Sequence, residues 1–196
     1  MKRLFLAIAL DQELALRLSR VAKEFEAACG PLIPHPPDDL HLTLSFLGEV
    51  EDTDLSGVIR SAAEEFRGVF APELELSGGL ELLPAGSDQP RVLTAPVTEV
   101  GEQLGRLGAL RNRAQQVALS RRCPANRTDR RRTFRPHVTL AKLKGTPPAP
   151  VGPLDSGLSR SWIGSEVALY ESLGVHGVDG GRYRQLMSWG LPMDAG

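Results

Sequence analysis

Apolar and polar residues alternate along Leu40-His-Leu-Thr-Leu-Ser-Phe-Leu47 and again along His137-Val-Thr-Leu-Ala-Lys-Leu143. A two-residue period is typical of strands that bury one face and expose the other. A continuous apolar run over 4–10 predicts a buried first strand. Segments bounded by turn residues predict four further strands, at 73–82, 91–97, 166–173 and 182–189.

Three stretches predict helices instead, because their apolar residues recur every three or four positions. The first lies between Asp11 and Gly30, the second covers about 53–66, and the third covers about 100–118. In the third helix we expect Leu104 on the inner side. Proline- and glycine-rich segments between these elements predict loops at 31–37, 84–90, 146–153 and 174–181.

This mixed order of strands and helices predicts an α+β fold. Each half of the chain contains a helix, a loop and then one of the two alternating strands. This approximate internal repeat predicts two similar lobes, each with an antiparallel sheet and helices, and an active-site cleft between them. The length suits one substantial domain, so we expect residues 1–196 to form a single two-lobed domain.

The composition narrows the classes of function. The formal net charge of -1 gives no overall attraction to nucleic acids or membranes. No segment approaches the roughly 20 apolar residues that cross a bilayer. Cys29 and Cys123 form no Cys-x-x-Cys pair, which argues against a zinc ribbon or a thioredoxin-like motif. A disulfide between these cysteines stays open, but we expect a reduced, cytoplasmic protein that acts as a monomer.

The sequence His-x-Thr-Leu occurs twice, at 41–44 and at 137–140. Residues i and i+2 of a strand share a face, so Thr43 should lie beside His41 and Thr139 beside His137. The intervening apolar residues would face the core. For two of four histidines to carry both Thr and Leu by chance has odds on the order of one in a few thousand. The doubled motif therefore indicates function.

Two His–Thr pairs suit the hydrolysis of a cyclic phosphate. The reaction needs a base that takes a proton from water and an acid that protonates the departing ribose oxygen, and histidine serves both roles near neutral pH. Attacking and leaving oxygens lie on opposite sides of phosphorus, so we expect acid and base on opposite walls. The threonine hydroxyls can donate to the non-bridging oxygens. This scheme requires neither metal nor cofactor, and it leaves open which histidine is the acid.

With these motifs the chain resembles the RNA 2′,3′-cyclic phosphodiesterases of the two-histidine phosphoesterase superfamily, formerly called 2′-5′ RNA ligases. The resemblance covers nearly the whole chain. It includes Arg3-Leu-Phe-Leu-Ala-Ile-Ala-Leu10, Leu40-His-Leu-Thr-Leu-Ser-Phe-Leu-Gly-Glu-Val50, Phe134-Arg-Pro-His-Val-Thr-Leu-Ala-Lys142 and Leu169-Tyr-Glu-Ser172. It implies a two-lobed fold and metal-independent hydrolysis of RNA cyclic ends to a 2′-phosphate.

The resemblance also implies a role for each motif residue. His41 would donate a proton to the leaving 3′ oxygen, and His137 would accept a proton from the attacking water. Thr43 and Thr139 would hold the phosphate. After the second motif the family often has arginine where this chain has Lys142. Lysine keeps the charge but loses the bidentate phosphate geometry, so Lys142 is the weaker candidate for an RNA contact.

Arginines gather in the segment 111–135, where nine arginines and one acid give a local charge of about +8. This block predicts contacts with an RNA backbone, and Arg135 is one candidate. The alternative is a solvated loop over 120–132. Phe46, which we expect on the His41 face, and Phe134 are candidate platforms for a nucleobase, with packing in the core as the alternative.

The remaining histidines and the tryptophans are expected to have structural roles. His35 and His176 have no threonine partner and are expected at the surface. Trp162 and Trp189 are expected to pack in the interior. No ligand pair has the spacing of a metal site, so we expect no bound metal.

Two other functions compete with hydrolysis. The same histidines could join RNA ends through 2′-5′ ligation, with a 5′-hydroxyl attacking the cyclic phosphate, although water at bulk concentration should win. A non-catalytic RNA-end-binding module is the third candidate. Two titratable groups on opposite walls argue against that candidate, because binding alone does not need them.

Overall fold

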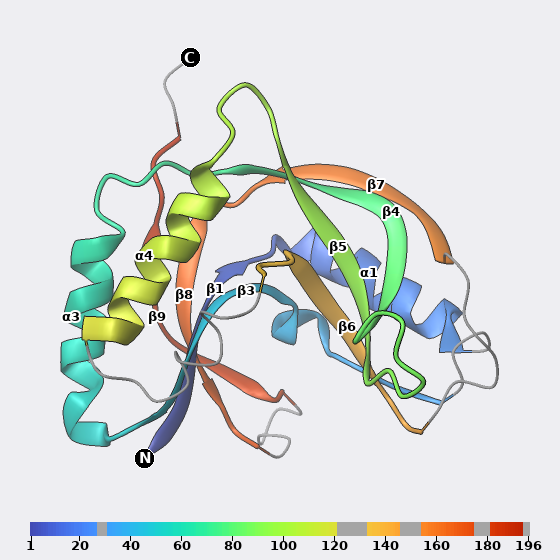
Figure 1. The fold of residues 1–196 in the computed structure, drawn as a ribbon, viewed down its shortest axis with the longest axis horizontal. Coiled ribbons are helices and arrows are strands. Elements are labelled where there is room, and N and C mark those ends of the chain that lie inside the picture. The colour runs from blue at the N-terminus through green and yellow to red at the C-terminus, as the bar shows by residue number, and fades with distance from the viewer. Residues whose placement is uncertain (27–30, 121–132, 146–153, 175–180, 194–196) are drawn as a thin grey trace.

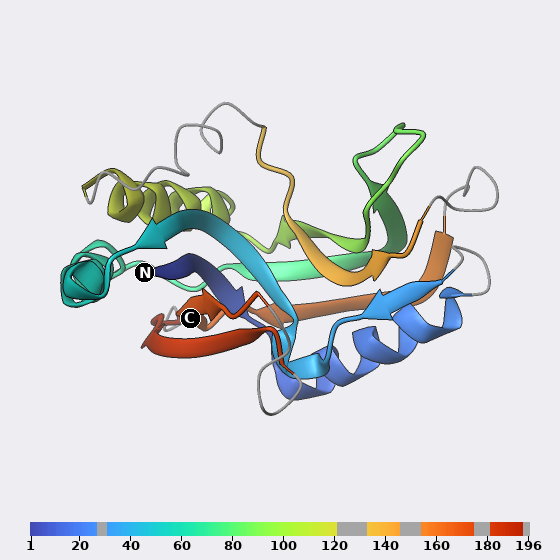
Figure 2. The ribbon, with the colours of Figure 1, turned by 90° about the horizontal axis from the view of Figure 1, so that it is seen from below.

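The fold is built around nine antiparallel strands, seen in a computed structural model that describes residues 1–26, 31–120, 133–145, 154–174 and 181–193. Within these residues the strands are β1 (Lys2–Ala9), β2 (Leu32–Pro34), β3 (His41–Val50), β4 (Glu73–Leu83), β5 (Val92–Val100), β6 (His137–Leu143), β7 (Leu154–Ile163), β8 (Glu166–Ser172) and β9 (Tyr183–Gly190). They follow one hydrogen-bonded path in the order β7-β4-β5-β6-β3-β1-β8-β9, with β2 paired to β6. The strands bend strongly along their length (Figure 2).

Three α-helices lie on two sides of these strands (Figure 1). They are α1 (Gln12–Glu24), α3 (Leu55–Glu65) and α4 (Arg106–Ser120), accompanied by the short 3-10 helices η1 (Pro37–Asp39) and η2 (Asp52–Asp54). Helix α1 contacts β2 and β6, whereas α4 contacts α3 and β3. Each half of the chain therefore supplies a helix that supports the motif strand of the other half.

The centre of the path joins the two motif strands. Only Leu42 of β3 and Val138 of β6 form a paired position there, and farther along, the same edge of β6 pairs with β2. The α+β class and the antiparallel strands predicted from the sequence are confirmed. The division into two lobes stays a prediction, because the strands form one path with a single paired position at its middle.

Both faces of β1 are buried, and each faces a different cluster. Leu4, Leu6 and Ile8 belong to the main core beneath the helices. Phe5 and Ala7 point the other way, into a smaller cluster with Ala168, Tyr170 and Tyr183. This double burial explains why the first strand is a continuous apolar run rather than an alternating one.

The structure corrects three expectations about elements. The proline-rich loop at 31–37 contains β2, which pairs at the edge of β6 and places Pro34 at its last position. Strand β7 was not expected at all, because its sequence is rich in serine and lacks alternation. Helix α4 begins at Arg106 rather than near 100, and Leu104 precedes it with 69% of its surface exposed.

The tryptophan prediction is confirmed. Trp162 is buried in the main core, and Trp189 packs against that core with its ring 5.8 Å from the ring of Phe66.

Candidate active site

The two His-x-Thr-Leu segments fold in the same way. In β3 and in β6 the histidine and the threonine are half-buried, the two residues after the threonine are buried, and the next residue is exposed. In both strands the leucine of the motif, Leu44 or Leu140, has no paired residue on the neighbouring strand, although the residues on either side of it do. Each motif therefore ends in a β-bulge, a feature that often lies beside active sites because it redirects side chains.

The bulges reverse the alternation of faces. Thr43 pairs with Ala7 and Phe46 pairs with Phe5, and antiparallel partners point to the same face. Phe46 therefore lies on the His41 face with 46% of its surface exposed, although strict alternation from His41 would turn it to the core. By the same shift, Lys142 lies on the His137 face of β6 and is exposed.

The paired position between the motif strands places the two motifs side by side. Leu42 lies opposite Val138 in an antiparallel arrangement. Extending this register by one residue in each direction puts His41 opposite Thr139 and Thr43 opposite His137. The two His–Thr pairs thus come from neighbouring strands and share one face of the sheet.

Each histidine is fixed by a hydrogen bond to a backbone carbonyl two residues earlier. The Nδ1 of His41 lies 2.7 Å from the carbonyl oxygen of Asp39, and the Nδ1 of His137 lies 2.7 Å from that of Arg135. A carbonyl oxygen only accepts, so Nδ1 carries the hydrogen in both rings. The Nε2 of each neutral ring is left as the nitrogen that can exchange a proton.

Aromatic rings surround His41. The ring centroid of Phe5 lies 4.7 Å from that of His41, the Tyr183 ring meets it edge-on at 5.1 Å, and the Tyr170 ring stacks at 5.6 Å. Burial in this wall lowers the pKa of His41 to about 4, against the opposing effect of the Asp39 hydrogen bond, and the nearby His137 lowers it further. In the free protein His41 is therefore neutral at pH 7.

Asp39 anchors the segment before His41. It is 3% exposed, and its carboxylate accepts hydrogen bonds from the backbone N–H groups of Arg182, at 2.9 Å, and Tyr183, at 3.2 Å. The same residue holds His41 through its carbonyl oxygen. Sequence reasoning missed Asp39, because its partners are backbone groups far along the chain.

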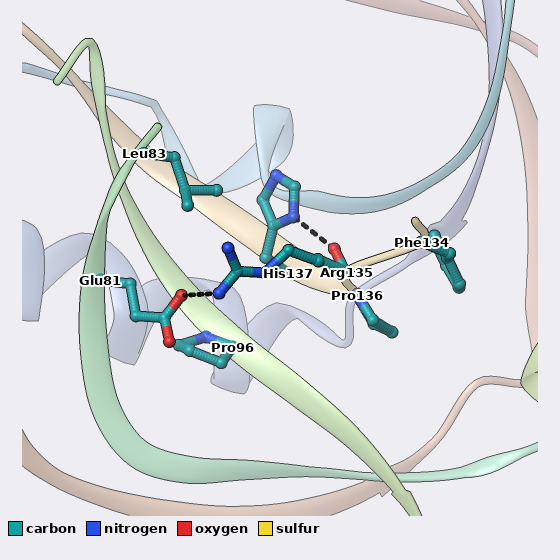
Figure 3. Close-up of a pocket in the computed structure, with 7 residues that line it drawn as sticks. All are labelled: Glu81, Leu83, Pro96, Phe134, Arg135, Pro136 and His137. Atoms are coloured by element: carbon teal, nitrogen blue, oxygen red, sulfur yellow. Dashed lines mark hydrogen bonds and ion pairs between the residues drawn. The ribbon is translucent and has the colours of Figure 1, made fainter. Parts of the chain in front are cut away.

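A cavity of about 260 Å³ opens beside His137, lined by Glu81, Leu83, Pro96, Phe134, Arg135, Pro136 and His137 (Figure 3). The Arg135 guanidinium crosses this cavity to the Glu81 carboxylate, 3.4 Å away. Both side chains are about half exposed, so the ion pair is weak and can open for a ligand. His41 is not among the residues that line this cavity.

Other predicted contacts have structural partners. Phe134 packs against the core, and the guanidinium of Arg111 covers its ring at 4.4 Å. Arg111 also donates to the carbonyl oxygen of Leu44, 2.6 Å away, and so ties α4 to the first motif. Arg113 pairs with Glu65 on α3. The rest of the arginine block, 121–132, lies outside the described residues, as do Cys29, Cys123 and His176.

The surface position expected for His35 is wrong. Its side chain is 3% exposed, and its ring lies parallel to that of Tyr183 with the centroids 6.1 Å apart. The reason is the unexpected strand: the backbone N–H of His35 donates to the carbonyl oxygen of Leu140 and continues the pairing of β2 with β6. Because of this pairing, the His35 side chain lies beside the Tyr183 ring and not at the surface.

Among the described residues, no group of three or more His, Cys, Asp or Glu side chains is placed to hold a metal ion. None of the helices in the same residues has the length and apolar character needed to cross a membrane.

Comparisons with known proteins show similarity in sequence and in fold to phosphoesterases. The family model of LigT-like phosphoesterases matches residues 8–82, which contain the first motif. An RNA 2′,3′-cyclic phosphodiesterase of Archaeoglobus fulgidus is 25% identical over 142 residues, 72% of this chain and 73% of that protein. The crystal structure of TT0787 from Thermus thermophilus is 27% identical with a TM-score of 0.70, over 98% of this chain and 99% of that one.

The structure of E. coli LigT complexed with 3′-AMP is similar as well. It is 25% identical with a TM-score of 0.69, and the match covers 97% of this chain and 98% of that one. The likeness thus extends over both motifs. The resemblance inferred from the sequence is confirmed: the chain is similar to LigT-like phosphoesterases in sequence and in fold.

Proposed function

We propose that this chain hydrolyses RNA 2′,3′-cyclic phosphate ends to 2′-phosphates, with His41 and His137 as the acid and the base. The observation that carries this proposal is the equivalence of the two motifs. Each presents an imidazole whose Nδ1 is locked on a carbonyl oxygen, with a threonine beside it on the same face. Binding alone would not require two free Nε2 atoms on neighbouring strands. The phosphodiesterase relative from Archaeoglobus fulgidus supports the same activity.

In the proposed reaction, the Nε2 of His137 takes a proton from water as the water oxygen bonds to phosphorus. The bond from phosphorus to the 3′ oxygen breaks, and His41 gives its proton to that oxygen. The 2′ oxygen keeps the phosphoryl group. Thr43 and Thr139 donate hydrogen bonds to the non-bridging oxygens, where negative charge must be held. The roles of the two histidines rest on the resemblance.

The lowered pKa of His41 constrains this assignment. A proton donor must be protonated before the leaving oxygen departs, yet burial keeps the free imidazole neutral at pH 7. A bound cyclic phosphate brings a negative charge next to the ring and favours the imidazolium form. We therefore expect His41 to take up its proton as the substrate binds.

The test uses a short RNA that ends in a 2′,3′-cyclic phosphate, incubated with the protein in the presence of a chelator. We expect conversion to a 2′-phosphate and a bell-shaped pH dependence of kcat/KM. His41→Ala and His137→Ala should each lower kcat by at least a hundredfold, because general acid–base catalysis contributes about 10²–10⁴.

Four outcomes would contradict the proposal. A 3′-phosphate product would reverse the choice of leaving oxygen. Turnover that survives either histidine substitution would exclude the two-histidine mechanism. Binding of the RNA without turnover would favour an RNA-end-binding module, and a joined product formed with an added 5′-hydroxyl RNA would favour ligation.

A further inference from the structure

Three cations from separate elements gather beside the aromatic wall of His41. Arg3 lies two residues before Phe5 on β1, so the two side chains share a face of the sheet. This is the face that carries His41. Lys142 lies on the His137 face of β6 because of the bulge at Leu140. Arg182 directly precedes Tyr183, and its backbone N–H is held by Asp39.

The positive charges of the two arginines affect the pKa values of Lys142 and of Tyr183. Partial desolvation by its neighbours lowers the pKa of the exposed Lys142, and the charges of Arg182 and Arg3 lower it further. Burial and Asp39 raise the pKa of Tyr183, whereas Arg182 and Arg3 lower it. The strand register agrees with this: Arg3 pairs with Ser172, and Ser172 pairs with Tyr183, whose ring contacts His41.

Within the described residues, few negative charges balance the positive charges of Arg3, Lys142 and Arg182. None of the three cations forms an ion pair with another described residue, and the Asp39 carboxylate already accepts backbone N–H groups. The Nε of Arg182 is buried and has no hydrogen-bond partner there. A buried donor without an acceptor is costly, and an anionic ligand would relieve that cost.

The proposed reaction indicates which anion this is. The leaving 3′ oxygen belongs to the ribose, so the nucleoside and the RNA chain on its 5′ side extend from phosphorus toward His41. Water occupies the opposite side, near His137. The next anionic group along the RNA is the phosphodiester 5′ to the terminal nucleoside, and arginine forks suit its two free oxygens.

We propose that Arg3, Arg182 and Lys142 bind the internucleotide phosphodiester next to the cyclic end, so that the preferred substrate is an oligonucleotide rather than a cyclic mononucleotide. This inference rests on the proposed hydrolase function and adds its substrate class. The protein would then recognise the RNA strand through a phosphate contact, which does not depend on the base sequence.

The test compares a cyclic mononucleotide with a dinucleotide of the same terminal base, both ending in a 2′,3′-cyclic phosphate. We expect a higher kcat/KM for the dinucleotide. Arg3→Gln and Arg182→Gln should each lower the dinucleotide-to-mononucleotide ratio of kcat/KM by roughly tenfold, because a hydrogen bond to a charged group contributes about that factor. Arg182→Lys should retain more of the ratio than Arg182→Gln, since it keeps the charge.

Arg184→Gln is the matched control. Arg184 lies on the same strand as Tyr183 but pairs with Glu171 on the opposite face, so its loss should leave the ratio unchanged. Equal kcat/KM for both substrates, or a ratio that survives Arg3→Gln and Arg182→Gln, would overturn the inference while leaving the hydrolase intact. Failure of the unmodified protein to hydrolyse either substrate would instead overturn the proposed function.

Discussion

At the scale of single residues, the proposed reaction uses two threonine hydroxyls as well as two imidazoles. Thr43 and Thr139 stand beside the histidines on the one exposed face of strands whose other face is core. Valine has nearly the shape of threonine and tolerates the same backbone, so a Thr→Val change removes the donor without disturbing the strand.

We expect Thr43→Val and Thr139→Val each to lower kcat by roughly a hundredfold, the usual effect of removing one donor to a developing negative charge. Steady-state kinetics on an RNA with a cyclic end measures this. Thr98→Val, at an exposed position of β5, serves as the control and should have no effect. If the motif variants retained the wild-type kcat, the threonines would not hold the reacting phosphate.

At the scale of elements, the position of His41 depends on a contact between η1 and the start of β9. Asp39 supplies both ends of this link: its carbonyl oxygen holds the imidazole, and its buried carboxylate holds the backbone of 182–183. The Tyr183 ring in turn packs edge-on against His41. Asp39 is thus a positioning residue that acts through its neighbours.

Asp39→Asn tests this link. The amide keeps the size of the side chain but replaces one acceptor oxygen by a donor, which would face backbone N–H groups. We expect kcat to fall by about tenfold with a smaller change in KM, since one lost hydrogen bond to a charged group is worth about that factor. The nuclear magnetic resonance signals of the His41 ring should shift as well.

Asp38→Asn is the control for this prediction, because Asp38 is adjacent but not buried. An Asp39→Asn variant with unchanged kcat and an unshifted His41 signal would show that the link is only a support for β9.

The elements also show where sequence patterns stop being informative. Alternation correctly placed each threonine beside its histidine, because residues i and i+2 share a face until the bulge begins. It does not explain the face of Phe46 or of Lys142, because the bulged leucine is an ordinary core residue that nothing marks in the sequence. The sequence pattern does not predict β2, because it contains Pro34, which is tolerated in a strand only at an edge such as this one beside β6.

Asp39 was missed for a related reason. A lone acid in a proline loop has many ordinary explanations, and its importance comes from contacts across 143 and 144 residues of sequence. The doubled motif could be recognised because each copy consists of consecutive residues. The contacts that Asp39 makes with the backbone of 182–183 join distant parts of the chain, so they could not be recognised from the sequence.

At the scale of the whole molecule, helix α1 supports β6 and helix α4 supports β3, so each motif is held by the half of the chain that does not contain it. Arg111 strengthens one of these crossings by donating to the carbonyl oxygen of Leu44. The two motifs are therefore brought together only when both halves have folded. The stability of the whole fold should then depend on the state of the site.

The pH dependence of unfolding tests this coupling. Burial lowers the pKa of His41 from 6.5 to about 4. Between these values the unfolded chain binds a proton at His41 that the folded chain does not, so the free energy of unfolding falls as the pH falls from 6.5 toward 4. The full shift corresponds to roughly 3 to 4 kcal/mol, from about 1.4 kcal/mol for each pKa unit.

Urea denaturation at several pH values between 7 and 4.5 measures this dependence, with His41→Gln as the comparison because glutamine does not titrate there. Other groups, including the ion-paired Glu171, contribute equally to both proteins. The wild-type free energy of unfolding should therefore fall more steeply with decreasing pH than that of the variant, and the gap should open only below pH 6.5. Parallel curves would mean that the buried site accepts a proton on His41 at no cost to the fold. In that case a neutral His41 in the free protein would no longer constrain the mechanism, and the imidazole could be charged before the substrate arrives.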